Sequence, residues 1–499
     1  MTDLNRLALV TLPGSTLSLE TVRHLERYRP GGIVLLKQNL VNLEQSRALV
    51  ADLNSVLGDD LLLAIDQEGG SVWRTPFLPS APSAGNLGVS NDPHLARAIG
   101  SEIARGIRSI GANWCFGPVL DLGINPLNPV IVERSFGAEP NIVAELGKAW
   151  LEGLQAGGVA ACAKHFPGHG DTYQDSHHDL PRVDKSLAQL ERLEFAPFKA
   201  VLDSVASLMT AHIVFPAIDP DLPATLSPRM LTGLLRETWG YAGAIVTDAM
   251  NMGAITAHWG RGAAAVQSLA AGADMLEVFG SLGDQCETFV ALERAAMQGV
   301  LTKARIATAL ERRDQLTQTY PARTLEANPA RTLGANPART LEQPSLSPDL
   351  MIGAWQRGIG RSGNPQPPAP GAAIALILAR DNPGGSAWES APSGSDVLRA
   401  LRRVYRVTPI WLEADSPQNA VPLALEAKLT CDALIFASSQ AGRMTSAARD
   451  AVSRMQPDLH LALWNPHAVS DLNAPALLTY GLTAESLEAL VRVLREPSV

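Results

Sequence analysis

Residues 159–181 read V-A-A-C-A-K-H-F-P-G-H-G-D-T-Y-Q-D-S-H-H-D-L-P. A short apolar run ends abruptly at Lys164 and His165, and a loop rich in glycine and proline then carries three more histidines and three aspartates. Catalytic side chains commonly lie on loops that leave a rigid strand. The stretch therefore predicts a buried strand followed by a reactive loop.

Seven similar apolar runs surround this one, with helix-like segments between them. The eight predicted strands are 7–12, 32–36, 61–65, 113–120, 159–163, 208–212, 244–247 and 275–279. The predicted helices include 19–28, 43–57, 93–110, 142–156, 187–205, 228–239 and 262–271. Strands that alternate with helices indicate a parallel sheet, and eight such units over about 300 residues fit a closed (β/α)8 TIM-type barrel.

Polar side chains lie at the C-terminal ends of most of these runs, where active sites of such barrels are built. They are Asp66, Asp121, Lys164, His165, His212 and Asp248. An open doubly wound sheet is the alternative fold, but it would gather such residues at one switch point rather than from most of its strands.

The chain changes character after residue 320. Residues 322–344 repeat A-R-T-L-x-x-x-P with a period of eight, which is too short for a solenoid unit and predicts a semi-rigid spacer. Beyond it, the short apolar runs 372–378, 408–412, 433–437 and 459–463 alternate with helical segments. We therefore expect a catalytic barrel over 1–320, a proline-rich linker over 321–348 and a smaller C-terminal α/β sandwich domain over 349–499.

Composition excludes several classes of protein. The net charge of −9 argues against broad binding to nucleic acid, and no apolar stretch is long enough to span a membrane. No secretory signal pattern is recognised near Met1, so we expect a cytoplasmic protein. The four cysteines are far apart, which fits reduced thiols better than disulfides or a zinc site.

Five ordered segments carry a resemblance to a known family. They are I-D-Q-E-G-G-S-V-W-R (65–74), E-R-S-F (133–136), K-H-F-P-G-H-G-D-T (164–172), D-S-H-H-D-L-P (175–181) and V-T-D-A-M-N-M-G-A-I (246–255). Together they closely resemble glycoside hydrolase family 3, and most of all the two-domain type of its β-N-acetylglucosaminidase (β-N-acetylhexosaminidase) branch.

The resemblance implies retaining hydrolysis of terminal, non-reducing β-linked N-acetylglucosamine, typically on muropeptides during peptidoglycan recycling. It maps the nucleophile onto Asp248, the general acid/base onto His177 and the partner of that histidine onto Asp175. A histidine suits this role because its ordinary pKa of about 6.5 lets it donate and accept a proton near neutral pH. The residues implied to bind the sugar are Asp66, Arg74, Arg134, Lys164 and His165. No cofactor and no metal are expected.

Two positions depart from the family pattern. Ser71 stands where an arginine is frequent, and Ala249 follows Asp248 where a second aspartate is frequent. Three other functions stay open: a phosphorylase on the same fold, a broader β-glucosidase or β-xylosidase, and a non-catalytic sugar-binding protein. The absence of an Asp-Glu dipeptide disfavours a substrate-assisted hexosaminidase.

Simpler interpretations also exist for single residues. Asp248 and Asp121 fit helix N-caps, and we retain that structural interpretation for Asp121. Arg134 and Lys164 fit ion-paired residues at the barrel rim, and the loop histidines fit a metal site, although no trio of ligands at suitable spacing is evident. We expect structural roles for His169 and His178, and we leave His212, which is expected to face the site, without a role.

Overall fold

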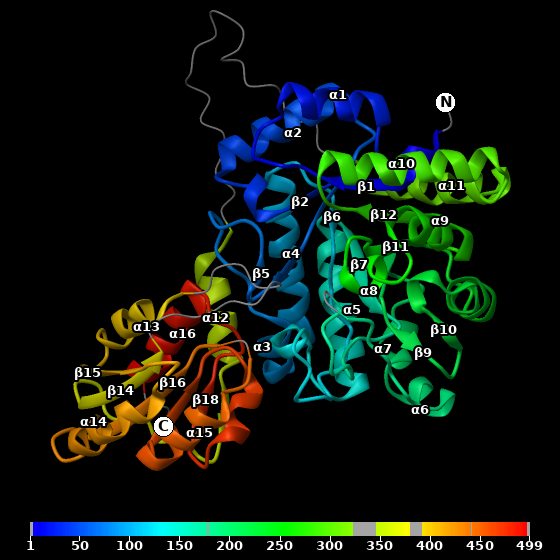
Figure 1. Cartoon of the computed structure of the whole chain (residues 1–499). Helices are drawn as coiled ribbons and strands as arrows, with labels where there is room; N and C mark the ends of the chain where they lie inside the picture. Colours follow the sequence, from blue (N-terminus) through cyan, green and yellow to red (C-terminus); the bar gives the residue numbers. More distant parts are fainter. Residues whose placement is uncertain (1–2, 177–178, 323–345, 380–391, 441, 497–499) are drawn as a thin grey trace, which may run out of the picture.

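A computed structural model describes residues 3–176, 179–322, 346–379, 392–440 and 442–496. Within these residues, eight parallel strands close into a barrel in the order β1-β12-β11-β8-β7-β6-β3-β2 (Figure 1). The strands are β1 (Ala8–Thr11), β2 (Gly32–Leu35), β3 (Leu62–Ile65), β6 (Trp114–Cys115), β7 (Ala160–Phe166), β8 (Ser207–Thr210), β11 (Ala244–Ala249) and β12 (Met275–Val278). The predicted TIM-type barrel is confirmed, and each predicted run supplies one strand.

Alternate residues of each strand face the inside of the barrel, because side chains on a strand point to opposite faces in turn. The buried cluster inside the barrel includes Leu62, Ala64, Ala160, Cys162, Ala244, Val246 and Met275. The residues between them pack with the surrounding helices, as Leu63 and Ile245 do. Continuing the inward series toward the C-terminal ends brings four charged side chains to the mouth of the barrel: Asp66, Lys164, Asp248 and Glu277.

Several of the helices begin where the sequence supplies a capping side chain. Ser18 accepts a hydrogen bond from the amide of Thr21 at the start of α1 (Leu19–Tyr28), and Asn42 caps α2 (Leu43–Leu57) in the same way. The other long helices of the barrel are α4 (Pro93–Ser109), α5 (Pro140–Ala156), α9 (Arg261–Ala271), α10 (Leu282–Met297) and α11 (Lys303–Thr319). Every described helix is too short or too polar to cross a lipid bilayer.

Two predicted helices differ from the expectation. The segment 187–205 divides into α6 (Leu187–Arg192) and α7 (Phe195–Lys199) at Leu193, whose φ of −110° and ψ of −94° are not helical. Pro197 has no amide to donate to the carbonyl oxygen of Leu193, so a continuous helix would lack this hydrogen bond. The segment 228–239 forms η5 (Arg229–Thr238), which has the wider π-helical hydrogen bonding. Both changes affect the outer layer and leave the strands of the barrel in place.

The C-terminal domain is the predicted smaller α/β domain. Its sheet has the order β13-β18-β17-β16-β14-β15, with β13 antiparallel to β18 and the other pairs parallel. The predicted strands are β14 (Ala373–Ala379), β15 (Arg406–Leu412), β16 (Ala433–Ser438) and β17 (Leu459–Ala462); β13 (Gly360–Ser362) and β18 (Ala476–Leu478) are too short to show a pattern in the sequence. The helices are α12 (Pro348–Arg357), α13 (Gly394–Leu401), α14 (Ala420–Ala427), α15 (Ser446–Met455) and α16 (Ala484–Arg495). The predicted linker lies mostly outside the described residues.

The two domains meet at α3 (Ala84–Ser90), which lies between the barrel and α12 (Figure 1). The side-chain amide of Asn86 donates to the carbonyl oxygens of Trp355 and Thr479 at 3.1 and 3.2 Å. The indole N–H of Trp355 donates back to the carbonyl oxygen of Ser80 at 3.3 Å. Buried hydrogen bonds in both directions fix the C-terminal domain against the mouth side of the barrel.

Candidate active site

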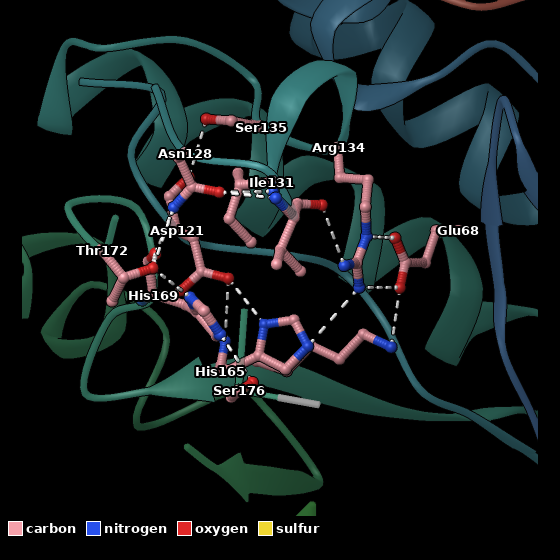
Figure 2. Close-up of polar contacts among 12 residues, drawn as sticks. Glu68, Asp121, Asn128, Ile131, Arg134, Ser135, His165, His169, Thr172 and Ser176 are labelled. Atoms are coloured by element: carbon pink, nitrogen blue, oxygen red, sulfur yellow. Dashed lines mark hydrogen bonds and ion pairs between the residues drawn. The ribbon is translucent and has the colours of Figure 1, made fainter. Parts of the chain in front are cut away.

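A network of buried ion pairs occupies one side of the barrel mouth. Lys164 Nζ lies 2.7 Å from Asp66 Oδ1 and 2.7 Å from Glu68 Oε1. Arg134 binds Glu68 through two parallel hydrogen bonds of 2.8 Å, from Nε to Oε2 and from Nη2 to Oε1 (Figure 2). Arg74 Nη2 lies 3.5 Å from the second oxygen of Asp66. The structure thus brings together four of the five predicted sugar-binding residues.

The charges in this network stabilise each other. Burial alone would raise the pKa of Glu68, but Arg134 and Lys164 outweigh it and hold that pKa well below its usual range. Burial would lower the pKa of Lys164, yet Asp66 and Glu68 raise it instead. Asp66 is the most accessible carboxylate of the network, with 17% of its side chain exposed against 7% for Glu68. Its oxygens are therefore the ones best placed to accept hydrogen bonds from a bound hydroxyl group.

His165, the fifth predicted sugar-binding residue, is held by Asp121. The Nδ1 of His165 lies 2.6 Å from Asp121 Oδ2, and Arg134 Nη2 lies 3.5 Å from the other ring nitrogen. Because a guanidinium group can only donate, this geometry assigns the ring hydrogen to Nδ1. Asp121 also accepts the backbone amides of His165 and His169. The expectation that Asp121 serves as a helix cap is wrong, because its carboxylate orients His165 and the start of the loop.

His169 joins two parts of the loop that follows β7. The two ring nitrogens of His169 lie 2.9 Å from Thr172 Oγ1 and 3.0 Å from Ser176 Oγ (Figure 2). Burial lowers the pKa of His169 to about 4, so this ring is neutral near pH 7. Asn128 holds the same turn by donating to the carbonyl oxygen of His169 at 2.8 Å.

Asp175, the predicted partner of the acid/base histidine, lies just beyond this anchored turn. Asp175 is half-buried, and its carbonyl oxygen accepts the amide of Asp179 at 3.0 Å. The carbonyl oxygen of Ser176 accepts the amide of Ala254 at 3.2 Å, which ties the loop to α8 (Gly253–Thr256). His177 and His178 lie outside the described residues, so the roles predicted for them and for Asp175 remain predictions.

Asp248 lies on the opposite side of the mouth, near the end of β11. It is half-buried, and its Oδ1 accepts the amide of Ala249 at 2.7 Å. It does not cap the next helix, because the residue at that position of α8 is Met252. The alternative interpretation of Asp248 as a helix cap is therefore wrong.

His212, which was left without a role, lies next to the end of β11. It is fully buried, with Nε2 donating to the carbonyl oxygen of Ala249 at 3.1 Å and Nδ1 lying 2.8 Å from Thr225 Oγ1. Its ring therefore supports the backbone next to Asp248, and the expectation that it faces the site stays a prediction.

Two carboxylic acids at the mouth were not predicted. Glu68 follows Asp66 by two residues and pairs with both Arg134 and Lys164. Glu277 on β12 is only 3% exposed, and no described group makes a hydrogen bond to its Oε1. Burial and then the charge of Asp248 raise the pKa of Glu277 well above its usual value. The signal for Glu277 was a lone charge in the run M-L-E-V-F at an inward position of the strand.

Comparison with protein families identifies the barrel. Residues 3–316 match the model described as the glycosyl hydrolase family 3 N terminal domain. The chain belongs to glycosyl hydrolase family 3. The resemblance seen in the sequence is therefore confirmed, and so is the prediction of a glycoside hydrolase of this family.

Individual relatives are similar to this chain over the barrel. The chain is 36% identical over 276 residues to a β-hexosaminidase from Alkalilimnicola ehrlichii, covering 54% of this chain and 79% of that protein. It is 35% identical over 293 residues to β-hexosaminidase A from Pseudoalteromonas piscicida, but this match spans only about half of that protein, 48%, and 54% of this chain.

A solved structure covers both domains. It is a family 3 β-N-acetylglucosaminidase from Paenibacillus sp. strain FPU-7, with 29% identity and a TM-score of 0.88 over 100% of this chain and 96% of that one. The predicted β-N-acetylglucosaminidase branch of family 3 is thus the branch that the relatives represent.

The departure at Ser71 has a structural counterpart. The hydroxyl of Ser71 donates to Glu133 in the segment that carries Arg134.

Within the described parts of the chain, no three His, Cys, Asp or Glu side chains are grouped as metal ligands would be. The expectation of a site without metal stays a prediction, as do the individual roles of the site residues.

Proposed function

We propose that this protein hydrolyses terminal, non-reducing β-linked N-acetylglucosamine with retention of configuration. The observation that carries the proposal is the meeting of two sets of groups at one end of the barrel. A paired network of charged donors and acceptors lies at the C-terminal ends of β3 and β7, and a half-buried carboxylate lies across from it on β11. Similarity to β-hexosaminidases supports the choice of N-acetylglucosamine as the sugar.

Asp248 would attack the anomeric carbon and form a glycosyl-enzyme intermediate. Retaining glycosidases need a carboxylate nucleophile that keeps a fixed position below the sugar ring. The backbone hydrogen bond from Ala249 and the support of His212 behind β11 restrict the movement of this carboxylate.

His177 would act as general acid in the first step and as general base in the second, with Asp175 orienting its ring. This assignment rests on the D-S-H segment, and the position of Ser176 supports it. Ser176 is buried, its hydroxyl lies 3.0 Å from His169 Nε2, and its carbonyl oxygen accepts the amide of Ala254, so the residue before the proposed acid is held in place.

The sugar would be bound by Asp66, Arg74, Arg134, Lys164 and His165. Each hydroxyl group of a sugar donates one hydrogen bond and accepts others, so it is matched by a carboxylate next to a cation. Asp66 with Lys164 and Arg74 forms such a group at the accessible edge of the network. We propose muropeptides as the natural source of the sugar, within the cytoplasm.

A product assay tests this proposal directly. The protein is incubated with p-nitrophenyl β-N-acetylglucosaminide, with and without phosphate, and the first product is identified by proton NMR. Free N-acetylglucosamine that appears first as the β anomer is the expected result. The α anomer would contradict the nucleophile, and N-acetylglucosamine 1-phosphate would indicate the phosphorylase instead. A panel with glucoside and xyloside substrates tests the hypothesis of a broader β-glucosidase or β-xylosidase. If none of the substrates is turned over, only the hypothesis of a non-catalytic sugar-binding protein remains.

The acid role of His177 is tested by the leaving group. His177→Ala should slow a substrate with a poor leaving group by about 100-fold or more while an activated aryl glycoside loses far less, because only the poor leaving group needs protonation. Equal losses on both substrates would contradict the role.

A further inference from the structure

The segment that carries Arg134 has an unusual backbone conformation. It is η3 (Val132–Arg134), a short 3-10 helix between the barrel mouth and the C-terminal domain. Val132 has a φ of 41°, in the left-handed region that β-branched residues rarely occupy. Such a conformation persists only where the surrounding structure holds it in place. Contacts around Val132 must therefore stabilise this conformation.

The C-terminal domain supplies the packing around Val132. This side chain is 7% exposed and belongs to the buried apolar cluster of that domain, together with Leu463, Trp464 and Leu482. Val72, from the loop after Asp66, joins the same cluster. Two side chains of the barrel therefore belong to the core of the other domain.

The next residue, Glu133, makes the polar link. It is 1% exposed, and its Oε1 accepts a hydrogen bond of 2.9 Å from the indole N–H of Trp464 and another from Ser71. Trp464 is itself 1% exposed, so water cannot replace this donor. A buried carboxyl group that loses its donor is destabilised, which makes the position of Glu133 depend on the C-terminal domain.

Arg134 follows directly and enters the site. Its amide donates to the carbonyl oxygen of Ile131 at 2.6 Å, which closes the short turn of η3. The guanidinium group then reaches Glu68 at 2.8 Å and His165 at 3.5 Å. A change in the direction of η3 would move this group away from both partners.

We infer that the C-terminal domain positions Arg134 for sugar binding by holding η3 through the packing of Val132 and the hydrogen bond from Trp464 to Glu133. The inference rests on the proposed role of Arg134 as a sugar ligand. It gives the second domain a part in substrate binding without any of its side chains entering the barrel mouth. Trp464, Glu133 and Val132 are positioning residues in this arrangement.

A pair of tryptophan variants tests the inference. Trp464→Phe removes the indole donor to Glu133, and Trp355→Phe makes the same chemical change in a fully buried tryptophan that donates to Ser80 instead. We expect the KM for an aryl β-N-acetylglucosaminide to rise about fivefold to tenfold in Trp464→Phe with little change in kcat, since one hydrogen bond is lost. Trp355→Phe should keep the KM of the unchanged protein at a similar loss of thermal stability. Equal KM changes in both variants would overturn the inference.

Hydrogen exchange separates this inference from the proposed function. The backbone of residues 130–136 should exchange faster in Trp464→Phe than in Trp355→Phe, whether or not the protein turns over this substrate. Unchanged exchange in Trp464→Phe would overturn the inference and leave the proposed function intact. Faster exchange with an unchanged KM would also overturn it, because Arg134 binding would then not depend on η3.

Substitutions of Val132 give a second, independent test. Val132→Gly and Val132→Ala both remove the packing, but only glycine adopts a positive φ at little cost. We therefore expect KM to be several-fold higher in Val132→Ala than in Val132→Gly, the reverse of the usual order of these residues in a helix. An equal or lower KM in Val132→Ala would contradict the role of the backbone conformation.

Discussion

The two sides of the barrel mouth treat buried carboxyl groups in opposite ways. On the side of β3 and β7, Glu68 contacts two cations, and its pKa lies well below the usual value. On the side of β11 and β12, Glu277 is equally buried, but Asp248 is its strongest charged neighbour and its pKa lies well above the usual value. Burial raises both pKa values. Two cations in direct contact outweigh it at Glu68, whereas at Glu277 the charges of Asp248 and Asp66 add to the rise and Lys164 opposes it only weakly. The paired side is therefore suited to binding the polar groups of a sugar, and the other side holds a carboxyl group that resists ionisation.

The largest expected effect is on the side of β11. Asp248→Ala should reduce turnover of an aryl β-N-acetylglucosaminide by about four orders of magnitude or more, because the covalent step loses its nucleophile. Steady-state kinetics measures the loss, and an unchanged circular dichroism spectrum serves as the control. Activity near that of the unchanged protein would show that this side of the mouth has another role.

The next effect is on the paired side. Glu68→Gln leaves Arg134 and Lys164 buried with one negative partner fewer, which costs about 3 to 5 kcal/mol when a buried pair is broken. Because the folded-state pKa of Glu68 is lowered, its stabilising contribution is present above the unfolded pKa of about 4.5 and is lost as the pH falls below it. The Tm difference between Glu68→Gln and the unchanged protein should therefore be large at pH 7 and shrink toward pH 3. A difference independent of pH would contradict the ion pairing.

Glu277→Gln should show the opposite dependence on pH. The folded-state pKa of Glu277 is raised, so its contribution to stability is fully present below about pH 4.5 and is lost progressively as the pH rises toward the folded value. Glutamine cannot ionise, so the variant should gain Tm relative to the unchanged protein between pH 5 and pH 8, by about a few degrees. Thermal unfolding over this range measures it. If the Tm of the variant relative to the unchanged protein rose on acidification instead, Glu277 would behave like Glu68, and the two sides of the mouth would not differ.

A smaller effect of the same sign is expected at Glu133. Burial raises the pKa of Glu133 to about 7, with the hydrogen bonds from Ser71 and Trp464 opposing the rise. Stability is therefore lost between about pH 4.5 and pH 7, by up to about 3 kcal/mol. Glu133→Gln should flatten this part of the unfolding profile, and the profile above pH 7 should stay parallel to that of the unchanged protein. A continued divergence above pH 8 would contradict the assignment.

The smallest expected effect is that of a chelator. Neither side of the mouth groups three metal ligands among the described residues. Dialysis against EDTA should leave kcat and KM unchanged within error, with a zinc hydrolase treated in parallel as a positive control. A strong loss that zinc restores would contradict the division of the mouth into a charge-paired side and a nucleophile side.

The barrel could be predicted because each strand carries its own signal. Apolar runs such as 61–65 and 244–247 end in a polar residue, and alternation then fixes which side chains face inward. The strands β13 and β18 could not be predicted, because three residues are too few to show a period. The break between α6 and α7 lies at Leu193, an ordinary helix former, so only Pro197 four residues later indicates it in the sequence.

Only the part of the site that lies within the recognised sequence motifs could be predicted. Asp66, Arg74, Arg134, Lys164 and His165 lie together at the barrel mouth, and their binding of a sugar stays a prediction. Glu277 was missed because its role depends on a neighbouring strand and not on the residues next to it in sequence. The partner of Glu133 is 331 residues away, and no local pattern in the sequence connects them. Long-range pairing of this kind follows from the docking of two domains.

That separation sets an order of events during synthesis. Ribosomes add roughly 5 to 20 residues per second, so about 20 to 60 s pass between the appearance of Glu133 and that of Trp464. The last barrel strand ends at Val278, well before this tryptophan is made. If the C-terminal domain positions Arg134, a nascent chain has a closed barrel before it has a finished sugar site. The protein would then reach its full affinity for substrate only after Trp464 has left the ribosome and the C-terminal domain has folded.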